Sequence, residues 1–97
     1  MTGSTRSSEG LDPRRRRLLF RSWHRGIRET DLILGRFADA FIATLGDADL
    51  DIYERLLDVP DPDLLAWVIG ECDVPADYDT PLFRRLCDFH TRTGAQG

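Results

Sequence analysis

The chain has 97 residues, of which 41% are hydrophobic and 31% charged, and this composition fits one globular domain rather than a disordered segment. A chain of this size buries about 60–70% of its unfolded surface, which leaves little room for an enclosed catalytic cavity beside the core. The formal net charge is −4, and no stretch approaches the roughly 20 apolar residues that cross a membrane, which argues against direct membrane insertion.

Residues 1–11 form a polar opening segment that we expect to be a disordered arm. The first helix is predicted to begin in "LDPRRRR", where Asp12 caps the helix and Pro13 takes its first position. It is predicted to end before Gly26, which stands where a glycine in a left-handed conformation commonly closes a helix.

Two further helices are predicted in the middle of the chain. The second runs from about residue 27 or 29 to Leu45 and ends at Gly46, and the third begins after Asp47 and stops at Pro60. In both helices the apolar residues recur at helical spacing and form one stripe. The residues of these stripes are Leu34, Phe37, Ala38, Phe41, Leu45, Leu50, Tyr53, Leu56 and Leu57.

The last two helices have clear starts. In "DPDLL", Asp61 is the expected cap and Pro62 the first helical residue, and in "TPLF", Thr80 and Pro81 take the same two roles. The stretch "ECDVPADYD" between them is predicted to be a connecting loop.

No segment alternates apolar and polar residues over a strand's length, so strands are not expected. The predicted fold class is all-α, a small single-domain bundle of about five helices. The helical domain is predicted to cover residues 12–92, followed by a frayed tail at 93–97.

Catalytic and metal-binding constellations are missing from the sequence. The two histidines, His24 and His90, and the two cysteines, Cys72 and Cys87, lie too far apart to form a recognised metal motif. The cysteines are predicted to be buried free thiols, and His90 is predicted to complement the dipole at the end of the last helix. No set of nucleophile, base and oxyanion donors stands out. We therefore expect no catalytic residues, no metal and no enzyme.

Charge is unevenly distributed: residues 1–36 carry +5 and residues 37–97 carry −9. The two halves are predicted either to meet oppositely charged partners or to be solvated faces. The run from Arg14 to Arg17 raises the question of nucleic acid, because a basic helix start can bind phosphates. The acidic later helices and a sequence pI of about 5.0 argue against it, so no nucleic-acid partner is expected.

The segment "HRGIRE", residues 24–29, is the most unusual part of the chain because a glycine interrupts a run of helix-compatible residues. One interpretation is structural: Gly26 lets two helices turn, and Arg25 pairs with Glu29 four residues on. The other is an interface, because charged side chains crowd a short joint beside Trp23, and Arg and Trp are favoured anchors of protein contacts. The residues alone leave both interpretations open.

The motif "RGIRETD" resembles the RGxxE signature of the small flavinylation factors of succinate dehydrogenase, the family of the bacterial SdhE proteins and mitochondrial succinate dehydrogenase assembly factor 2. The likeness extends to "RRLLFRSWHRGIRETDLILGRFAD" and to "YERLLDVPDPDLLAWVIGECDVPAD", and it covers roughly residues 14–90 in the same order. The family implies a five-helix fold, in agreement with the helices predicted from the residues.

The resemblance also implies a function. Such a protein binds the flavoprotein subunit of succinate dehydrogenase, or of the related fumarate reductase, and promotes covalent attachment of FAD to a histidine of that subunit. It acts as a chaperone or assembly factor that binds no cofactor tightly itself. We expect a monomer in the bacterial cytoplasm, or in the mitochondrial matrix of a eukaryote. The alternative is a generic helical adaptor or regulator that leaves flavin content unchanged.

By position, Arg25, Gly26 and Glu29 match the signature, and Arg28 and Asp31 match flanking positions that are often charged in the family. His24 stands where an arginine is common. The resemblance implies that these six residues bind the partner, with Gly26 allowing close approach of the two backbones.

Overall fold

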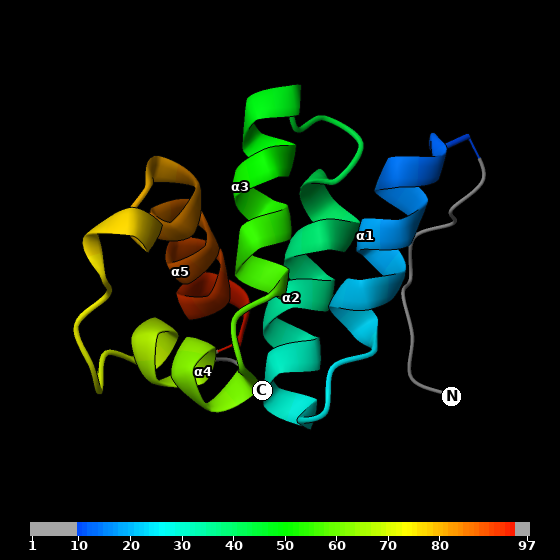
Figure 1. The fold of residues 1–97 in the computed structure, drawn as a ribbon. Coiled ribbons are helices and arrows are strands. Elements are labelled where there is room, and N and C mark those ends of the chain that lie inside the picture. Colours follow the sequence, from blue (N-terminus) through cyan, green and yellow to red (C-terminus); the bar gives the residue numbers. More distant parts are fainter. Residues whose placement is uncertain (1–9, 95–97) are drawn as a thin grey trace.

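The computed structural model describes residues 10–94, and over that range the fold is the expected bundle of five α-helices with no strand (Figure 1). The bounds of the elements are α1 Pro13–Trp23, α2 Arg28–Phe41, α3 Asp47–Leu57, α4 Asp61–Ile69, a short 3₁₀ turn η1 Ala76–Tyr78, and α5 Pro81–Gly94. None of the helices in this range is long and apolar enough to cross a membrane. The all-α prediction is confirmed.

Helix α2 lies at the centre of the bundle and packs against α1, α4 and α5. Its buried face comes from apolar residues at helical spacing, which include Leu34, Phe37 and Ala38, all 0% exposed. The ring of Phe37 lies 5.8 Å from that of Tyr53 on α3 and 6.0 Å from that of Phe89 on α5, measured between ring centroids. One apolar core therefore joins the helices into a single unit.

The start of α1 agrees with the prediction. The Asp12 carboxylate accepts a hydrogen bond from the backbone N–H of Arg15 at 3.2 Å, and Pro13 occupies the first helical position. Pairing with Arg15 also holds the pKa of the Asp12 carboxyl below its usual value. Leu11, which was assigned to the arm, is buried in the core. The folded domain thus starts earlier than predicted, and the rest of the arm, residues 1–9, lies outside the described residues.

The middle of the chain departs from the prediction at two helix ends. Helix α2 stops at Phe41 rather than Leu45, and Gly46 is the N-cap of α3 where Asp47 was expected. The guanidinium of Arg15 donates hydrogen bonds to the carbonyls of Ile42 and Leu45, at 2.9 and 2.5 Å. These two carbonyls, which follow the end of α2, are therefore satisfied by a side chain of α1.

The ends of α4 and α5 agree in part with the prediction from the sequence. Thr80 caps α5 as predicted, since its hydroxyl accepts from the N–H of Phe83 at 3.1 Å. Helix α4 is capped by Pro60 rather than by Asp61, and Gly70 closes it in a left-handed conformation with φ of 85°. Helix α5 runs to Gly94, so the backbone stays helical beyond the predicted start of the tail.

The basic and acidic halves of the chain pair with each other through ion pairs at the surface of the bundle. Arg14 on α1 lies 2.6 Å from Asp51 and 3.1 Å from Glu54 on α3, and Arg21 lies 2.8 Å from Asp58. Exposed pairs of this kind contribute little to stability, typically about 0–1 kcal/mol each. The pairs of Arg14 show that part of the basic run contacts α3 of the same chain. The sequence had suggested instead that the charged halves meet other molecules or face solvent.

A buried polar contact joins three helices. The hydroxyl of Tyr53 on α3 lies 2.6 Å from the hydroxyl of Ser22 on α1 and donates to the carbonyl of Leu34 on α2 at 3.1 Å. Both side chains are fully buried, and burial raises the pKa of Tyr53. The network fixes α1 relative to α2 and α3, and hence fixes the joint between α1 and α2.

Gly35 on α2 is predicted to be indispensable to this packing. A Cβ there would lie 2.4 Å from two ring carbons of Trp23, which is 8% exposed and donates its indole N–H to Asp39 at 3.1 Å. We expect Gly35→Ala to lower the free energy of unfolding by about 1–3 kcal/mol, the usual cost of overpacking.

Urea denaturation measures this change, with Gly46→Ala as the control. Nothing lies within 4 Å of a Cβ at that position, so the control should cost at most about 1 kcal/mol, from the loss of a glycine N-cap. Alanine normally stabilises a helix interior relative to glycine by about 0.5–1 kcal/mol. A more stable Gly35→Ala protein would therefore contradict the close approach of the two helices.

Candidate partner-binding site

The joint between α1 and α2 is a bend, and Gly26 does not adopt a left-handed conformation there. Helix α1 ends with His24 as its C-cap, and the positive-φ glycines within residues 10–94 are Gly10 and Gly70. A Cβ at Gly26 would lie 3.4 Å from Oδ2 of Asp61, an ordinary contact distance. The predicted left-handed closure of the helix is wrong, and neither backbone angle nor internal packing requires glycine at this position.

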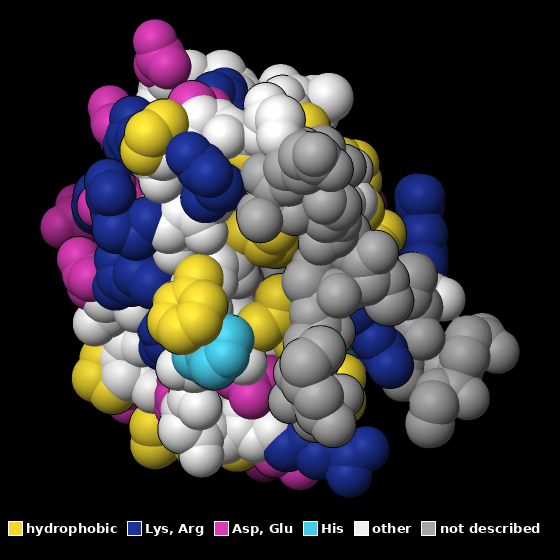
Figure 2. Space-filling view, turned by 90° about the vertical axis from the view of Figure 1, so that its right-hand side faces the viewer, with side chains coloured by type: hydrophobic (Ala, Val, Ile, Leu, Met, Phe, Trp, Pro, Cys, Tyr) yellow, Lys and Arg dark blue, Asp and Glu magenta, His cyan; other side chains and the backbone are white. Residues whose placement is uncertain are grey.

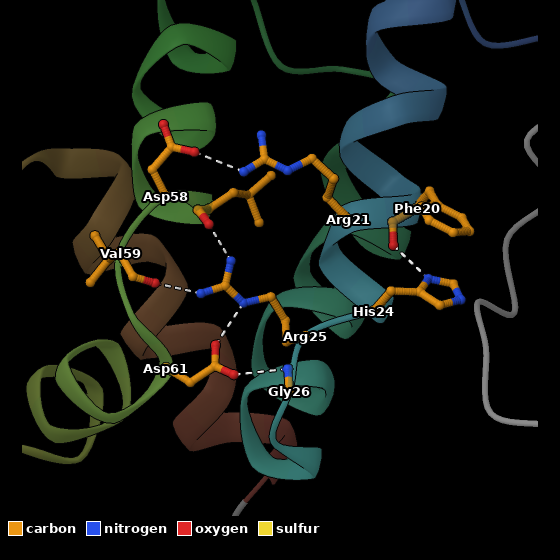
Figure 3. A pocket seen from close by; sticks show the side chains of 9 residues that line it. Phe20, Arg21, His24, Arg25, Gly26, Asp58, Val59 and Asp61 are labelled. Carbon is orange, nitrogen blue, oxygen red and sulfur yellow. Dashed lines mark hydrogen bonds and ion pairs between the residues drawn. The ribbon is translucent and has the colours of Figure 1, made fainter.

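Arg25 points inward across the joint rather than toward Glu29 (Figure 3). Its Nε lies 2.7 Å from Oδ1 of Asp61, and its two terminal nitrogens donate to the carbonyls of Leu57 and Val59. These carbonyls belong to the end of α3 and the loop after it, where helical carbonyls lack partners and a positive charge is favourable. The Arg25 side chain is only 10% exposed. The expected pairing with Glu29 is wrong, because the guanidinium is taken up by α3 and α4.

Two carboxylates hold the backbone of the joint. Oδ2 of Asp61 accepts the N–H of Gly26 at 2.9 Å, and Oδ1 of Asp31 accepts the N–H of Arg25 at 2.6 Å. Asp61 therefore uses both oxygens on the joint, and its side chain is 12% exposed. The sequence had suggested a helix cap for Asp61 and a partner contact for Asp31.

Four of the six residues predicted to bind a partner lie on the surface: His24, Gly26, Arg28 and Glu29. The six therefore divide into two groups: Arg25 and Asp31 make bonds inside the joint, and the other four surround it.

An open groove of about 450 Å³ runs beside Gly26 between α1 and the α3–α4 connection (Figure 3). Its lining residues are Phe20, Arg21, His24, Arg25, Gly26, Leu57, Asp58, Val59 and Asp61.

An exposed aromatic pair forms one wall of this groove. The rings of Phe20 and His24 stack with centroids 3.8 Å apart, and Nδ1 of His24 donates to the carbonyl of Phe20 at 2.7 Å. Phe20 is 61% exposed, which is unusual for a side chain of this size. Figure 2 shows a histidine and a hydrophobic side chain together on this side of the molecule, next to a group of basic side chains. The i, i+4 spacing of Phe20 and His24 was the sequence signal for this contact, and it was missed.

Glu29 lines a second groove, of about 260 Å³, between α2, α4 and α5. It shares that groove with the exposed side chain of Ile69, with Arg36 and with His90. Burial and the nearby Arg36 lower the pKa of His90. The expectation that His90 complements a helix dipole is therefore not supported, since α5 continues for another turn and the surroundings favour the neutral ring.

The cysteines differ from the prediction. Cys72 is exposed in the loop after α4, whereas Cys87 is half-buried and burial raises its pKa. Among residues 10–94 there is no cluster of three or more histidine, cysteine or acidic side chains that would suit a metal ion.

Comparison with known proteins identifies the family. The family described as "Flavinator of succinate dehydrogenase" matches residues 16–90, which is most of the chain. The chain belongs to this family. It is 39% identical over 82 residues to the FAD assembly factor SdhE of Acetobacter pasteurianus, an alignment that covers 84% of this chain and 75% of that protein.

Mitochondrial relatives are similar over most of this chain. Succinate dehydrogenase assembly factor 2 of Dictyostelium discoideum is 34% identical over 87 residues, which cover 90% of this chain and 61% of that protein. Its counterpart in Scheffersomyces stipitis is 44% identical over 69 residues, which cover 71% of this chain and 46% of that protein. The chain thus spans about half to three fifths of these two mitochondrial proteins, and the flavinator family includes both bacterial and mitochondrial members.

Proposed function

We propose that this chain binds the flavoprotein subunit of succinate dehydrogenase through the surface around the α1–α2 joint and promotes covalent attachment of FAD to that subunit. Membership of the flavinator family supports a role in flavin attachment, and the bacterial relative is named an FAD assembly factor. The flavoprotein of fumarate reductase is a second partner of the same kind. The chain acts as a monomer and without a tightly bound cofactor.

The observation that carries the proposal for the site is Gly26. Its backbone conformation does not require glycine, and a Cβ would fit against Asp61, so the fold itself gives no reason for the missing side chain. An exposed glycine beside a groove is explained by close approach of another backbone. His24, Arg28 and Glu29, all exposed around it, supply a polar rim of the kind that surrounds a protein contact.

Helper action needs no reactive group in this chain. Flavin attachment requires the flavin ring and the acceptor histidine of the flavoprotein to be held together, and positioning of this kind lowers a barrier by several kcal/mol. A factor that binds the aligned form of the flavoprotein more tightly shifts the subunit toward that form by the difference in affinity. The rigid joint, tied to α3 and α4 by Arg25 and Asp61, suits this role because it presents one fixed shape.

The adaptor alternative makes a different prediction. A generic helical adaptor would bind some other protein and would not bind the flavoprotein subunit. Co-purification tests this: the tagged chain is expressed with the flavoprotein subunit, and the complex is isolated by affinity and gel filtration. We expect a stoichiometric complex, and two separate peaks at micromolar concentrations would contradict the proposal.

Phe20 is expected to be an anchor of this contact. Because its side chain is 61% exposed, Phe20→Ala should change the free energy of unfolding by less than about 0.5 kcal/mol. Burial of the ring against a partner should make the same substitution raise the dissociation constant by about tenfold or more. Calorimetric titration with the purified flavoprotein measures the change.

The matched control is Ile69→Ala, which removes a second exposed large hydrophobic side chain, in the second groove. We expect it to change the dissociation constant by less than about threefold, within the spread of near-neutral interface positions. Equal affinities of the wild-type and Phe20→Ala proteins would exclude the aromatic wall from the contact.

A further inference from the structure

The side chain of Asp61 connects the joint to α4 through both of its carboxylate oxygens. Oδ1 lies 2.7 Å from Nε of Arg25, and Oδ2 accepts the N–H of Gly26 at 2.9 Å. Figure 3 shows the carboxylate between these two groups, at the start of the helix that follows Val59. Asp61 is the first residue of α4, where a negative charge is favourable.

We propose that Asp61 is a positioning residue for the partner surface, which fixes the backbone of Gly26 in the orientation that the flavoprotein contacts. This inference rests on the proposed function, because it assumes that Gly26 is the contact. It assigns a role to a residue 35 positions away from Gly26 and outside the RGxxE signature. The reason is geometric: residues 24–27 lie outside any helix, and the N–H of Gly26 donates to Asp61.

The two oxygens have separable tasks. Loss of the bond from Oδ1 to Arg25 should destabilise the fold, because it leaves one charge of a pair that is only 10% and 12% exposed without its partner. The bond from Oδ2 to Gly26 orients a surface amide and adds less to stability. A substitution that keeps the charge but shifts the second oxygen should therefore alter binding more than folding.

Asp61→Asn and Asp61→Glu distinguish these tasks. An asparagine has one acceptor oxygen, so its amide nitrogen faces the donor of either Arg25 or Gly26. A glutamate keeps the ion pair with Arg25 but moves the carboxylate by one methylene, which disrupts the bond to Gly26. The control is Asp79→Asn, since Asp79 also pairs with an arginine, Arg84, but its side chain is 44% exposed and does not line the groove beside Gly26.

The test measures the affinity of the folded variants for the purified flavoprotein subunit by calorimetric titration, well below each melting temperature. We expect both Asp61 variants to bind about tenfold or more weakly, and Asp79→Asn to bind like the wild type. Wild-type affinity of both folded Asp61 variants would overturn the inference and leave the proposed function intact. Failure of the wild-type chain to bind would overturn both.

A second measurement uses the wild-type protein alone, so the inference stays testable if the variants do not fold. Amide hydrogen exchange should show the Gly26 N–H protected by about tenfold or more over the free-chain rate, because its hydrogen bond to Asp61 must open first. Exchange of Gly26 at the free-chain rate would show that the bond does not persist in solution, and would overturn the inference.

Discussion

Replacement of Arg25 by alanine is expected to lower the free energy of unfolding by about 3–5 kcal/mol, because it leaves the Asp61 carboxylate buried without its partner. The carbonyls of Leu57 and Val59 lose donors at the same time. Small domains are stable by only about 5–15 kcal/mol, so the variant should be near its unfolding transition at physiological temperature. Urea denaturation followed by circular dichroism measures the loss.

Arg21→Ala is the matched control for this prediction. Arg21 lies one turn earlier on α1 and pairs with Asp58, whose side chain is 69% exposed, so its removal should cost no more than about 1 kcal/mol. A loss of less than about 1 kcal/mol for Arg25→Ala would show that its guanidinium is not structural and is free to contact a partner. That outcome would restore the direct role that the RGxxE resemblance implied for Arg25.

Gly26→Arg is expected to have the opposite profile, with the fold retained and the function lost. Glycine is not required there by its backbone angle, so the free energy of unfolding should change by less than about 1 kcal/mol. An arginine side chain would stand on the surface where the flavoprotein backbone must approach, and the dissociation constant should rise by about 100-fold or more. Thermal unfolding and calorimetric titration on the same sample separate the two effects.

The control is Gly46→Arg, which places the same side chain on another exposed glycine, at the N-cap of α3 beyond the far end of α2. It should leave binding unchanged and cost at most about 1 kcal/mol of stability, because glycine is a better N-cap than most residues. An unfolded Gly26→Arg protein would instead mean that the glycine serves the fold.

The helices were predictable because their signals are local. Asp12 and Pro13 start α1, Thr80 and Pro81 start α5, and the apolar stripe of α2 has helical spacing. Errors arose where a tertiary contact replaced a local one. Helix α2 ends four residues before Leu45, and the guanidinium of Arg15 donates to the carbonyls of Ile42 and Leu45 in the segment that follows.

The position of the partner surface stays a prediction, while the structure revises what individual residues do there. The signature directs attention to the α1–α2 joint, but the i, i+4 spacing suggests that Arg25 pairs with Glu29, whereas its partner Asp61 is 36 residues away. The sequence likewise predicts that Asp61 caps a helix, because aspartate before a helix start is a common N-cap. An aspartate that instead bonds a distant loop has the same sequence pattern. Nothing in the sequence reveals that Phe20 is exposed, since apolar aromatics are usually buried.

The central claim is that this chain promotes covalent flavin attachment through the surface at Gly26. The most direct measurement is in-gel flavin fluorescence of the denatured flavoprotein subunit after expression without this chain, with it, or with its Gly26→Arg variant, normalised to subunit protein. We predict a strong covalent-flavin band with the wild-type chain and a weak band in the other two samples. Equal bands in all three samples would contradict the account.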